Sequence, residues 1–165
     1  MSQQYSFYFN SQRCLKCYAC EIACLQWHGI TPGTIKPRRV LEFTRGTFPS
    51  VTRQFLSTAC RHCAKAPCAE TCPVQAIQRR EYDGIVVVDR QKCIGCRHCL
   101  ETCPFGIPQY AEDGTMQKCD MCLDRLEKGQ RPFCVSSCPT LALNWGTVAE
   151  MTGLAAQKSF RREDS

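Results

Sequence analysis

The distribution of cysteine constrains this chain more than any other feature. Sixteen of its 165 residues are cysteine, about one in ten, and they fall into four groups of four. The groups are Cys14, Cys17, Cys20 and Cys24; Cys60, Cys63, Cys68 and Cys72; Cys93, Cys96, Cys99 and Cys103; and Cys119, Cys122, Cys134 and Cys138. Such a content is typical of a small chain that is held together by disulfides or by metal.

The sequence shows no signal for export or for a membrane span, which argues against disulfides. Residues 1–10 contain no charged segment followed by an apolar stretch, and no twin arginine. The longest apolar runs, such as Ile85–Val88, are far shorter than the roughly 20 residues that span a bilayer. We therefore expect a cytoplasmic protein with no direct membrane insertion. Because cytosolic thiols are kept reduced, we expect the cysteines to bind metal.

The spacing of the cysteines is typical of [4Fe–4S] clusters. The first and third groups read C-x2-C-x2-C-x3-C, the second reads C-x2-C-x4-C-x3-C, and the fourth reads C-x2-C-x11-C-x3-C. Three of the groups end in Cys-Pro, as the bacterial ferredoxin motif does. Zinc would suit the fourth group alone, but it does not explain three closely spaced cysteines followed by a fourth. The sequence therefore predicts four [4Fe–4S] clusters.

The fourth cysteine of each motif is expected to serve a neighbouring cluster, as it does in two-cluster ferredoxins. The predicted ligand sets are Cys14, Cys17, Cys20 and Cys138 for cluster 1; Cys24, Cys119, Cys122 and Cys134 for cluster 2; Cys60, Cys63, Cys68 and Cys103 for cluster 3; and Cys72, Cys93, Cys96 and Cys99 for cluster 4. Two motifs that exchange their fourth cysteines hold their two clusters close together. We therefore expect the four clusters to form a line of redox centres.

The segments between the cysteines repeat in a nested order, which predicts an α+β fold of two bacterial-ferredoxin-like units. The inner unit occupies residues 60–108, and the domain that contains it spans residues 60–114. The outer unit is split into residues 1–30 and 115–148, and residues 149–165 form a C-terminal tail. In the inner unit we expect a short helix that begins at Cys72 and a strand at Ile85–Val88. By analogy, a strand at Tyr5–Phe9 is expected to pair with a strand at about Ala142–Trp145.

Residues 31–59 separate the first two groups of cysteines and are expected to form a hairpin insertion. Two strand-like runs, Val40–Phe43 and Val51–Leu56, lie on either side of a turn signal at Phe48-Pro49. Long insertions in compact domains are usually functional, which favours a docking surface for a large partner subunit. The alternative is a solvated loop that packs over a cluster.

The charge balance is basic, with 21 Lys and Arg against 15 Asp and Glu and a formal net charge of +6. Such an excess can indicate nucleic acid or an anionic membrane. The basic runs Lys36–Arg39 and Arg79–Arg80 lack interleaved aromatic residues, however, and we expect them on a solvated or partner-facing surface. Four clusters with about −2 each would turn the total to about −2. We interpret the basic excess as counter-charge for the cofactors and expect no nucleic-acid partner.

Few other residues suggest chemistry. Lys16 lies inside the first motif, and our hypothesis is that its ammonium stabilises the reduced form of that cluster and raises its potential. We expect His28, His62 and His98 beside the clusters or at the surface, because the cysteines already supply a full set of ligands. No nucleophile motif, phosphate loop or dinucleotide fingerprint is present, so no residue is assigned a catalytic role.

Several motifs resemble those of the four-cluster iron–sulfur subunits of the DMSO reductase family of molybdenum or tungsten enzymes. The motifs are Cys60-Arg-His-Cys63, Gly84–Asp89, Cys93-Ile-Gly-Cys96-Arg-His-Cys99, Cys103-Pro-Phe-Gly, Lys118-Cys119-Asp-Met-Cys122-Leu-Asp-Arg125 and Pro132-Phe-Cys134-Val-Ser-Ser-Cys138-Pro. The resemblance extends from about Tyr5 to Gly146. Similar small subunits occur in multisubunit tungsten aldehyde oxidoreductases.

The resemblance implies a non-catalytic electron-transfer subunit of an enzyme complex in anaerobic metabolism. It implies electron relay between a large subunit with a Mo- or W-pterin centre and a flavin, quinone-linked or ferredoxin partner. Relatives without a signal can be exported while attached to a signal-bearing partner, which is an alternative to a cytoplasmic location. A free-standing soluble polyferredoxin, which carries electrons without a fixed partner, is the alternative function.

Overall fold

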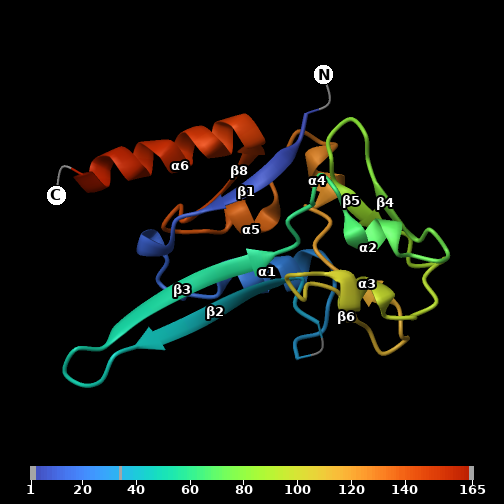
Figure 1. Cartoon of the computed structure of the whole chain (residues 1–165), viewed down its shortest axis with the longest axis horizontal. Coiled ribbons are helices and arrows are strands. Elements are labelled where there is room, and N and C mark those ends of the chain that lie inside the picture. The colour runs from blue at the N-terminus through green and yellow to red at the C-terminus, as the bar shows by residue number, and fades with distance from the viewer. Residues whose placement is uncertain (1–2, 34, 164–165) are drawn as a thin grey trace.

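The chain folds into short helices and two-stranded sheets (Figure 1). The structure, a computed structural model, describes residues 3–33 and 35–163. The strands are β1 (Tyr5–Phe9), β2 (Arg38–Arg45), β3 (Thr52–Ala59), β4 (Ile77–Arg79), β5 (Val86–Val88), β6 (Gln109–Tyr110), β7 (Met116–Gln117) and β8 (Leu143–Thr147). The helices are α1 (Ala19–Trp27), α2 (Pro67–Glu70), α3 (His98–Thr102), α4 (Leu123–Leu126), α5 (Phe133–Ser136) and α6 (Val148–Glu163), with a 3-10 turn, η1, at Ser11–Arg13. Within the described residues, no helix is long and apolar enough to cross a membrane.

The short helices end close to the fourth cysteines of the motifs. Helices α2, α3 and α5 stop one or two residues before Cys72, Cys103 and Cys138. The prediction of a helix that begins at Cys72 is wrong, because a turn follows this cysteine and β4 begins at Ile77. Gln75 has a φ of 49°, in the left-handed region, which a right-handed helix cannot contain.

The expected pairing of the N-terminal strand with a late strand is confirmed. Strand β1 runs antiparallel to β8, with Phe7 opposite Trp145 and Tyr5 opposite Thr147. The rings of Tyr5 and Trp145 are stacked, with centroids 4.9 Å apart. The pairing brings the first and last groups of cysteines to the same half of the molecule. Strands β4 and β5 make the corresponding antiparallel pair in the other half, with Ile77 opposite Val88.

The expected hairpin between the first two motifs is also confirmed and is longer than the sequence indicated. Strands β2 and β3 are antiparallel, with register from Arg38 opposite Ala59 to Arg45 opposite Thr52. The hairpin extends away from the rest of the molecule (Figure 1). Gly46 permits the turn, because it has a φ of 85° and an added Cβ would lie 2.2 Å from the carbonyl oxygen of Ser50.

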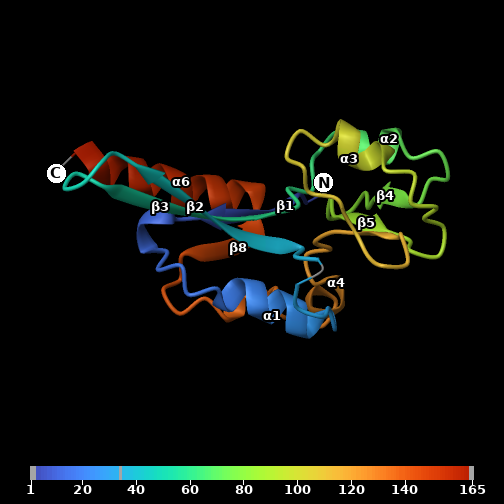
Figure 2. The same cartoon turned by 90° about the horizontal axis from the view of Figure 1, so that it is seen from below.

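The two halves of the molecule lie side by side (Figure 2). Helices α2 and α3 with β4 and β5 gather at one end, and α1, β1, β8, the hairpin and α6 occupy the other. The segment expected as a C-terminal tail is mostly helix α6, which packs on β1 and β8. Its first turn is capped reciprocally, since Thr147 N donates to Glu150 Oε2 at 2.7 Å and Glu150 N donates to Thr147 Oγ1 at 3.3 Å.

Cysteines form part of both hydrophobic cores. One core contains Ala66, Ile77, Val86, Cys99 and Met116, and the other contains Cys134, Val135 and Leu143. Cys68, Cys72 and Cys93 pack against the first core, and Cys20 and Cys138 pack against the second. Because cores this small bury little apolar surface, the fold depends on what the thiols bind.

Candidate metal centres

One cavity lies in the half of the molecule that contains α2, α3, β4 and β5, called the inner half below. Four cysteines line it: Cys60, Cys63, Cys68 and Cys103. Three come from the second motif, and the fourth is the last cysteine of the third motif. Apolar groups such as Val86 and Ile107 form much of the wall, and Lys118 contributes a cation. Burial, reinforced by the neighbouring thiols and opposed by Lys118, raises the pKa of Cys68 to about 11. The cavity brings together the four residues expected to ligate cluster 3.

A second cavity is lined by Cys72, Cys93, Cys96 and Cys99, the residues expected to ligate cluster 4. The hydroxyl of Tyr110 lies 3.1 Å from Sγ of Cys99. Burial and the contact with this thiol raise the pKa of Tyr110, so the hydroxyl keeps its proton at neutral pH. It can therefore donate a hydrogen bond to a Cys99 thiolate.

The four cysteines expected around cluster 2 are all buried, Cys24, Cys119, Cys122 and Cys134. They lie close enough for some of these thiols to affect the pKa of others. Burial raises the pKa of Cys24 to about 12, and Cys134 and Cys122 act in the same direction. Burial also raises the pKa of Cys119, with Cys134 and Cys24 reinforcing it. Thiols with such raised pKa values become thiolates only when positive charge is bound beside them.

The cysteines expected around cluster 1 are more accessible. Cys20 and Cys138 pack against one core, and Cys138 contributes to the raised pKa of Cys20. Burial favours the neutral thiol of Cys138, but hydrogen bonds from the backbone of Leu143, Ala142 and Thr140 and from the Thr140 hydroxyl lower its pKa overall. Cys14 and Cys17 lie between η1 and α1, and Cys17 is exposed.

The loops between the first two cysteines of each motif share one backbone conformation. The residue before the second cysteine has a positive φ in all four: Lys16 (56°), His62 (47°), Gly95 (69°) and Met121 (66°). This left-handed residue reverses the loop and turns backbone N–H groups toward the sulfurs. Gly95 adopts the conformation without a Cβ, which would lie 2.6 Å from the carbonyl oxygen of Gly114.

Backbone N–H groups are directed at sulfur in three of the motifs. His62 N lies 3.5 Å from Sγ of Cys60, Met121 N lies 3.4 Å from Sγ of Cys119, and Met116 N lies 3.3 Å from Sγ of Cys93. Such N–H groups stabilise thiolates, because a donor lowers the free energy of the charged form.

The residues present fit iron–sulfur clusters. All sixteen cysteines are free, and they supply soft sulfur donors in sets of four together with N–H donors to sulfur. Zinc sites take four ligands, usually from two pairs of cysteines or histidines, and they do not explain three closely spaced cysteines joined by a fourth from another motif.

Comparison with known proteins identifies the family. Residues 51–148 match the family model of a 4Fe-4S dicluster domain. The chain is 42% identical over 160 residues to the B subunit of the anaerobic dimethyl sulfoxide reductase of Escherichia coli, covering 92% of this chain and 77% of that protein. It is 37% identical to the thiosulfate reductase electron transfer subunit of Salmonella typhi (99% and 87% covered) and 34% identical to the formate dehydrogenase iron–sulfur subunit of Wolinella succinogenes (94% and 88% covered).

This chain belongs to the iron–sulfur subunits of the dimethyl sulfoxide reductase family. It is an electron-transfer protein that carries multiple [4Fe–4S] clusters. The family that the cysteine motifs indicated is therefore confirmed.

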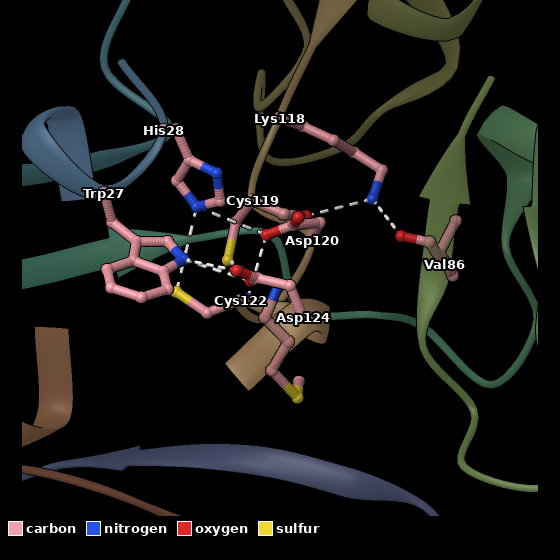
Figure 3. Close-up of polar contacts among 9 residues, drawn as sticks. Trp27, His28, Val86, Lys118, Cys119, Asp120, Cys122 and Asp124 are labelled. Atoms are coloured by element: carbon pink, nitrogen blue, oxygen red, sulfur yellow. Dashed lines mark hydrogen bonds and ion pairs between the residues drawn. The ribbon is translucent and has the colours of Figure 1, made fainter. Parts of the chain in front are cut away.

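In this iron–sulfur subunit, a group of polar side chains surrounds Cys122 (Figure 3). His28 Nε2 lies 3.7 Å from Sγ of Cys122 and 3.4 Å from a carboxylate oxygen of Asp120. Beside it, Trp27 Nε1 donates to both carboxylate oxygens of Asp124 at 3.0 Å. These contacts fix the end of α1 against α4 and place the expected histidine, His28, beside a cysteine.

The other two histidines differ in their surroundings. His62 is fully buried, and its Nδ1 accepts a hydrogen bond from Val86 N at 3.0 Å. Burial lowers the pKa of His62, and the cations Lys118 and Arg38 lower it further, so the ring is neutral. Because Nδ1 is the acceptor, Nε2 carries the proton. His98 is exposed at the start of α3, at the surface as expected.

Lys16, the residue expected to tune a potential, pairs its ammonium with the carboxylate of Glu42 on β2. The hydrogen bond to Glu42 raises the pKa of Lys16, and Arg53 also approaches Glu42, with Nε at 3.5 Å. The positive charge of Lys16 is thus partly neutralised by Glu42, and its effect on a potential stays a prediction.

The basic runs are more buried than the sequence suggested. We expected Lys36–Arg39 on a solvated or partner-facing surface, which is wrong for Arg38, since this side chain is only 1% exposed. Because successive side chains of a strand point to opposite faces, Arg39 lies on the other face of β2, where it donates to the carbonyl of Gly106 at 3.0 Å. The pair at Arg79–Arg80 is also half-buried. Sequence reasoning missed Arg38 as a residue of the site.

Proposed function

We propose that this iron–sulfur subunit relays electrons through four [4Fe–4S] clusters between a Mo- or W-pterin catalytic subunit and a flavin, quinone-linked or ferredoxin partner. The observation that carries the proposal is the grouping of the cysteines by fours, in sets that combine two motifs. The relatives are subunits of two reductases and of a formate dehydrogenase, which favours a subunit over a free polyferredoxin. We assign the chain itself no catalytic residue.

The ligand sets that we propose combine paired motifs in two ferredoxin-like units. Cys60, Cys63, Cys68 and Cys103 hold one cluster and Cys72, Cys93, Cys96 and Cys99 hold another, in an inner unit that spans 60–108. Cys24, Cys119, Cys122 and Cys134, and Cys14, Cys17, Cys20 and Cys138, hold the clusters of the split outer unit, 1–30 and 115–148. The pairing of strands β1 and β8 across the sequence supports the split unit.

Proximity of the sets supports a linear order from cluster 1 to cluster 4. Cys20 packs against the core that contains Cys134, which links the two outer clusters. Cys119 lies close enough to Cys60 for their charges to interact, which links the outer unit to the inner one. Cys68 and Cys72 pack against the same core, which links the two inner clusters. When bound, each cluster supplies a site for one-electron transfer. The thiols and apolar side chains that line the cavities would hold these sites.

The exposure of the cysteines supports electron exchange at the two ends of the line. Cys17 and Cys96 are exposed, whereas the four cysteines of cluster 2 are buried. The first and third motifs supply most ligands of the two end clusters. In each of them an exposed apolar residue follows the first cysteine: Leu15 and Ile94. These exposed ends are where partner proteins can approach the redox centres.

The hairpin β2–β3 is our proposed docking surface for the catalytic subunit. It lies beside the outer end of the line, because Lys16 contacts both Glu42 on β2 and the ring of Phe55 on β3. Leu41 and Phe43 lie on one face of β2 and are 40% and 48% exposed. Phe48 at the tip is 92% exposed. Large exposed apolar groups of this kind are typical of protein interfaces.

Anaerobic purification of the native complex tests the proposal. A tagged chain should co-purify with a large pterin-containing subunit at a fixed ratio, and the chain should contain about sixteen iron atoms and as many acid-labile sulfides. A monomer on size exclusion that reduces several acceptors would instead support the free polyferredoxin. Zinc in place of iron, or four to eight irons per chain, would refute the four-cluster assignment.

A further inference from the structure

The side chain of Arg38 is buried between β1 and the hairpin without an acidic partner. It is 1% exposed, and its guanidinium lies over the ring of Phe7, 4.4 Å from the centroid. Its Nη1 donates to Oγ of Ser57 at 3.1 Å. In the part of the chain that the structure describes, its Nε and Nη2 have no hydrogen-bond partner, and no carboxylate forms an ion pair with it.

The groups that face Arg38 include four cysteines of the outer unit. His62 and Cys60, from the motif of cluster 3, also lie near it. The thiols that act on its charge are Cys134, Cys119, Cys20 and Cys24. In turn, the positive charge of Arg38 favours the thiolate form of Cys119, Cys24 and Cys20. Ser57 connects the guanidinium to this set, because its Oγ also lies 3.5 Å from Sγ of Cys20.

An unpaired guanidinium is costly at such a place. Arginine does not lose its proton in proteins, and a buried charge without a counter-charge costs several kcal/mol. Other cations in this region have their partners: Lys36 pairs with Glu21 at 2.5 Å, and Lys118 donates to the carbonyl oxygens of Val86 and Cys119. The free donors of Arg38 therefore point to negative charge that arrives with the cofactors.

We propose that Arg38 sets the reduction potential of the two outer clusters, whose cysteines it faces directly and through Ser57. The inference rests on the ligand sets proposed above. Reduction adds one electron from the redox partner to a cluster and changes no bond or proton. It therefore adds one negative charge, which the fixed positive charge of Arg38 stabilises in a medium of low dielectric constant. Arg38 thus favours the reduced state and raises the potential of these clusters over that of the same clusters without it.

The test is a potentiometric EPR titration of the intact complex, with dithionite as reductant. The variants are Arg38→Gln, which removes the charge, and Arg38→Lys, which keeps it. Arg39→Gln is the matched control for the outer clusters, because Arg39 is the next residue of β2 and its guanidinium binds the carbonyl of Gly106, near Cys103 of the inner unit. The signals of the two outer clusters are identified as those that Cys20→Ser and Cys122→Ser alter.

We expect Arg38→Gln to shift the outer-cluster signals to a lower potential and to shift the inner clusters less, with full iron content. Arg38→Lys should retain most of the wild-type potential, and Arg39→Gln should leave the potentials of the outer clusters unchanged. Because the guanidinium stays charged, the shift should be the same from pH 6 to pH 9. Unchanged potentials in a fully loaded Arg38→Gln variant would overturn the proposal, and so would an equal shift of all clusters.

If Arg38→Gln fails to bind its clusters, the comparison with Arg38→Lys still tests the proposal. In that case, full iron and near wild-type potentials in Arg38→Lys would support a charge requirement. Loss of the outer clusters from both variants would overturn it, since Arg38 would then only shape the fold. Wild-type iron content separates the two levels: fewer than about sixteen irons contradicts the four-cluster function, whereas unchanged potentials with full iron contradict only the role of Arg38.

Discussion

The carboxylate of Glu21, on α1, accepts a hydrogen bond from the backbone N–H of Val40, on β2, at 3.1 Å. The second carboxylate oxygen of Glu21 binds Nζ of Lys36 at 2.5 Å. Glu21 is itself buried, at 4% exposure, and lies next to Cys20 in sequence. This residue therefore ties the helix that carries two cluster cysteines to the strand that begins with Arg38.

Replacing Glu21 should loosen that connection. Glu21→Ala leaves the Val40 N–H without an acceptor, and we expect a loss of about 1–3 kcal/mol. Glu21→Gln keeps an acceptor oxygen and should cost less. The measurement is the guanidinium midpoint for loss of the cluster absorbance under anaerobic conditions. Gln26→Ala, at an exposed position of α1, is the control and should leave the midpoint unchanged. Equal midpoints for Glu21→Ala and this control would contradict the prediction.

Lys16 and Glu42 offer a paired test of charge at the outer end of the line. Lys16→Met should lower the potential of the cluster built on Cys14, Cys17 and Cys20, because a cation is removed. Glu42→Gln should raise it, because the ammonium loses its counter-charge. Both side chains are partly exposed, so solvent screening should make these shifts smaller than that of Arg38→Gln. EPR titration of both variants decides, and no shift in any centre would refute a role for Lys16.

Much of the arrangement could be predicted from the sequence because it follows from the cysteine spacing. The motifs predicted which residues meet at the cavities lined by Cys60 and Cys72, since the fourth cysteine of a ferredoxin motif serves the neighbouring cluster. The nested order predicted the β1–β8 pair, since the segments flanking Cys14 and Cys138 repeat those of the inner half.

Other features depend on the tertiary structure and could not be predicted. Arg38 sits in a run of basic residues that resembles a surface, and its burial follows from the register of β2 against β3. The turn after Cys72 depends on a left-handed Gln75, a residue type with no strong preference for that conformation. A signal for α6 was present in Thr147 and Glu150, whose spacing is that of a capping box.

The capping of α6 yields a local prediction. Thr147→Ala removes the hydroxyl that accepts from Glu150 N, which should cost about 1 kcal/mol and speed amide exchange in the first turn of α6 about fivefold. Hydrogen bonds from Thr147 lower the pKa of Glu150, so its carboxylate is ionised at neutral pH, and Glu150→Gln should weaken the same turn. Hydrogen exchange with mass spectrometry measures both effects. Gln157→Ala, at an exposed position two turns further along α6, should leave the first turn unchanged.

The hairpin tip should matter for assembly and not for the clusters. Phe48→Ser or Phe43→Ser removes a large exposed apolar group, and we expect at least one of them to weaken binding of the catalytic subunit about thirtyfold. Iron content and EPR signals should stay unchanged, because neither side chain lines a cysteine cavity. Tyr82→Ser, an exposed residue of the inner half, is the control. Full affinity in a Phe43→Ser, Phe48→Ser double variant would exclude the hairpin as the docking surface.

Cys138 and Cys103 are the last cysteines of their motifs and should serve different clusters. Cys138→Ser should damage the cluster built on Cys14, Cys17 and Cys20, since its thiol packs near Cys20, and should spare the inner unit. Cys103→Ser should damage the cluster built on Cys60, Cys63 and Cys68 and spare the outer unit, since it lines that cavity. Iron analysis and EPR distinguish the two patterns. If both variants alter the same signal, the ligand sets are wrong, because one cubane cannot take its fourth thiolate from both positions.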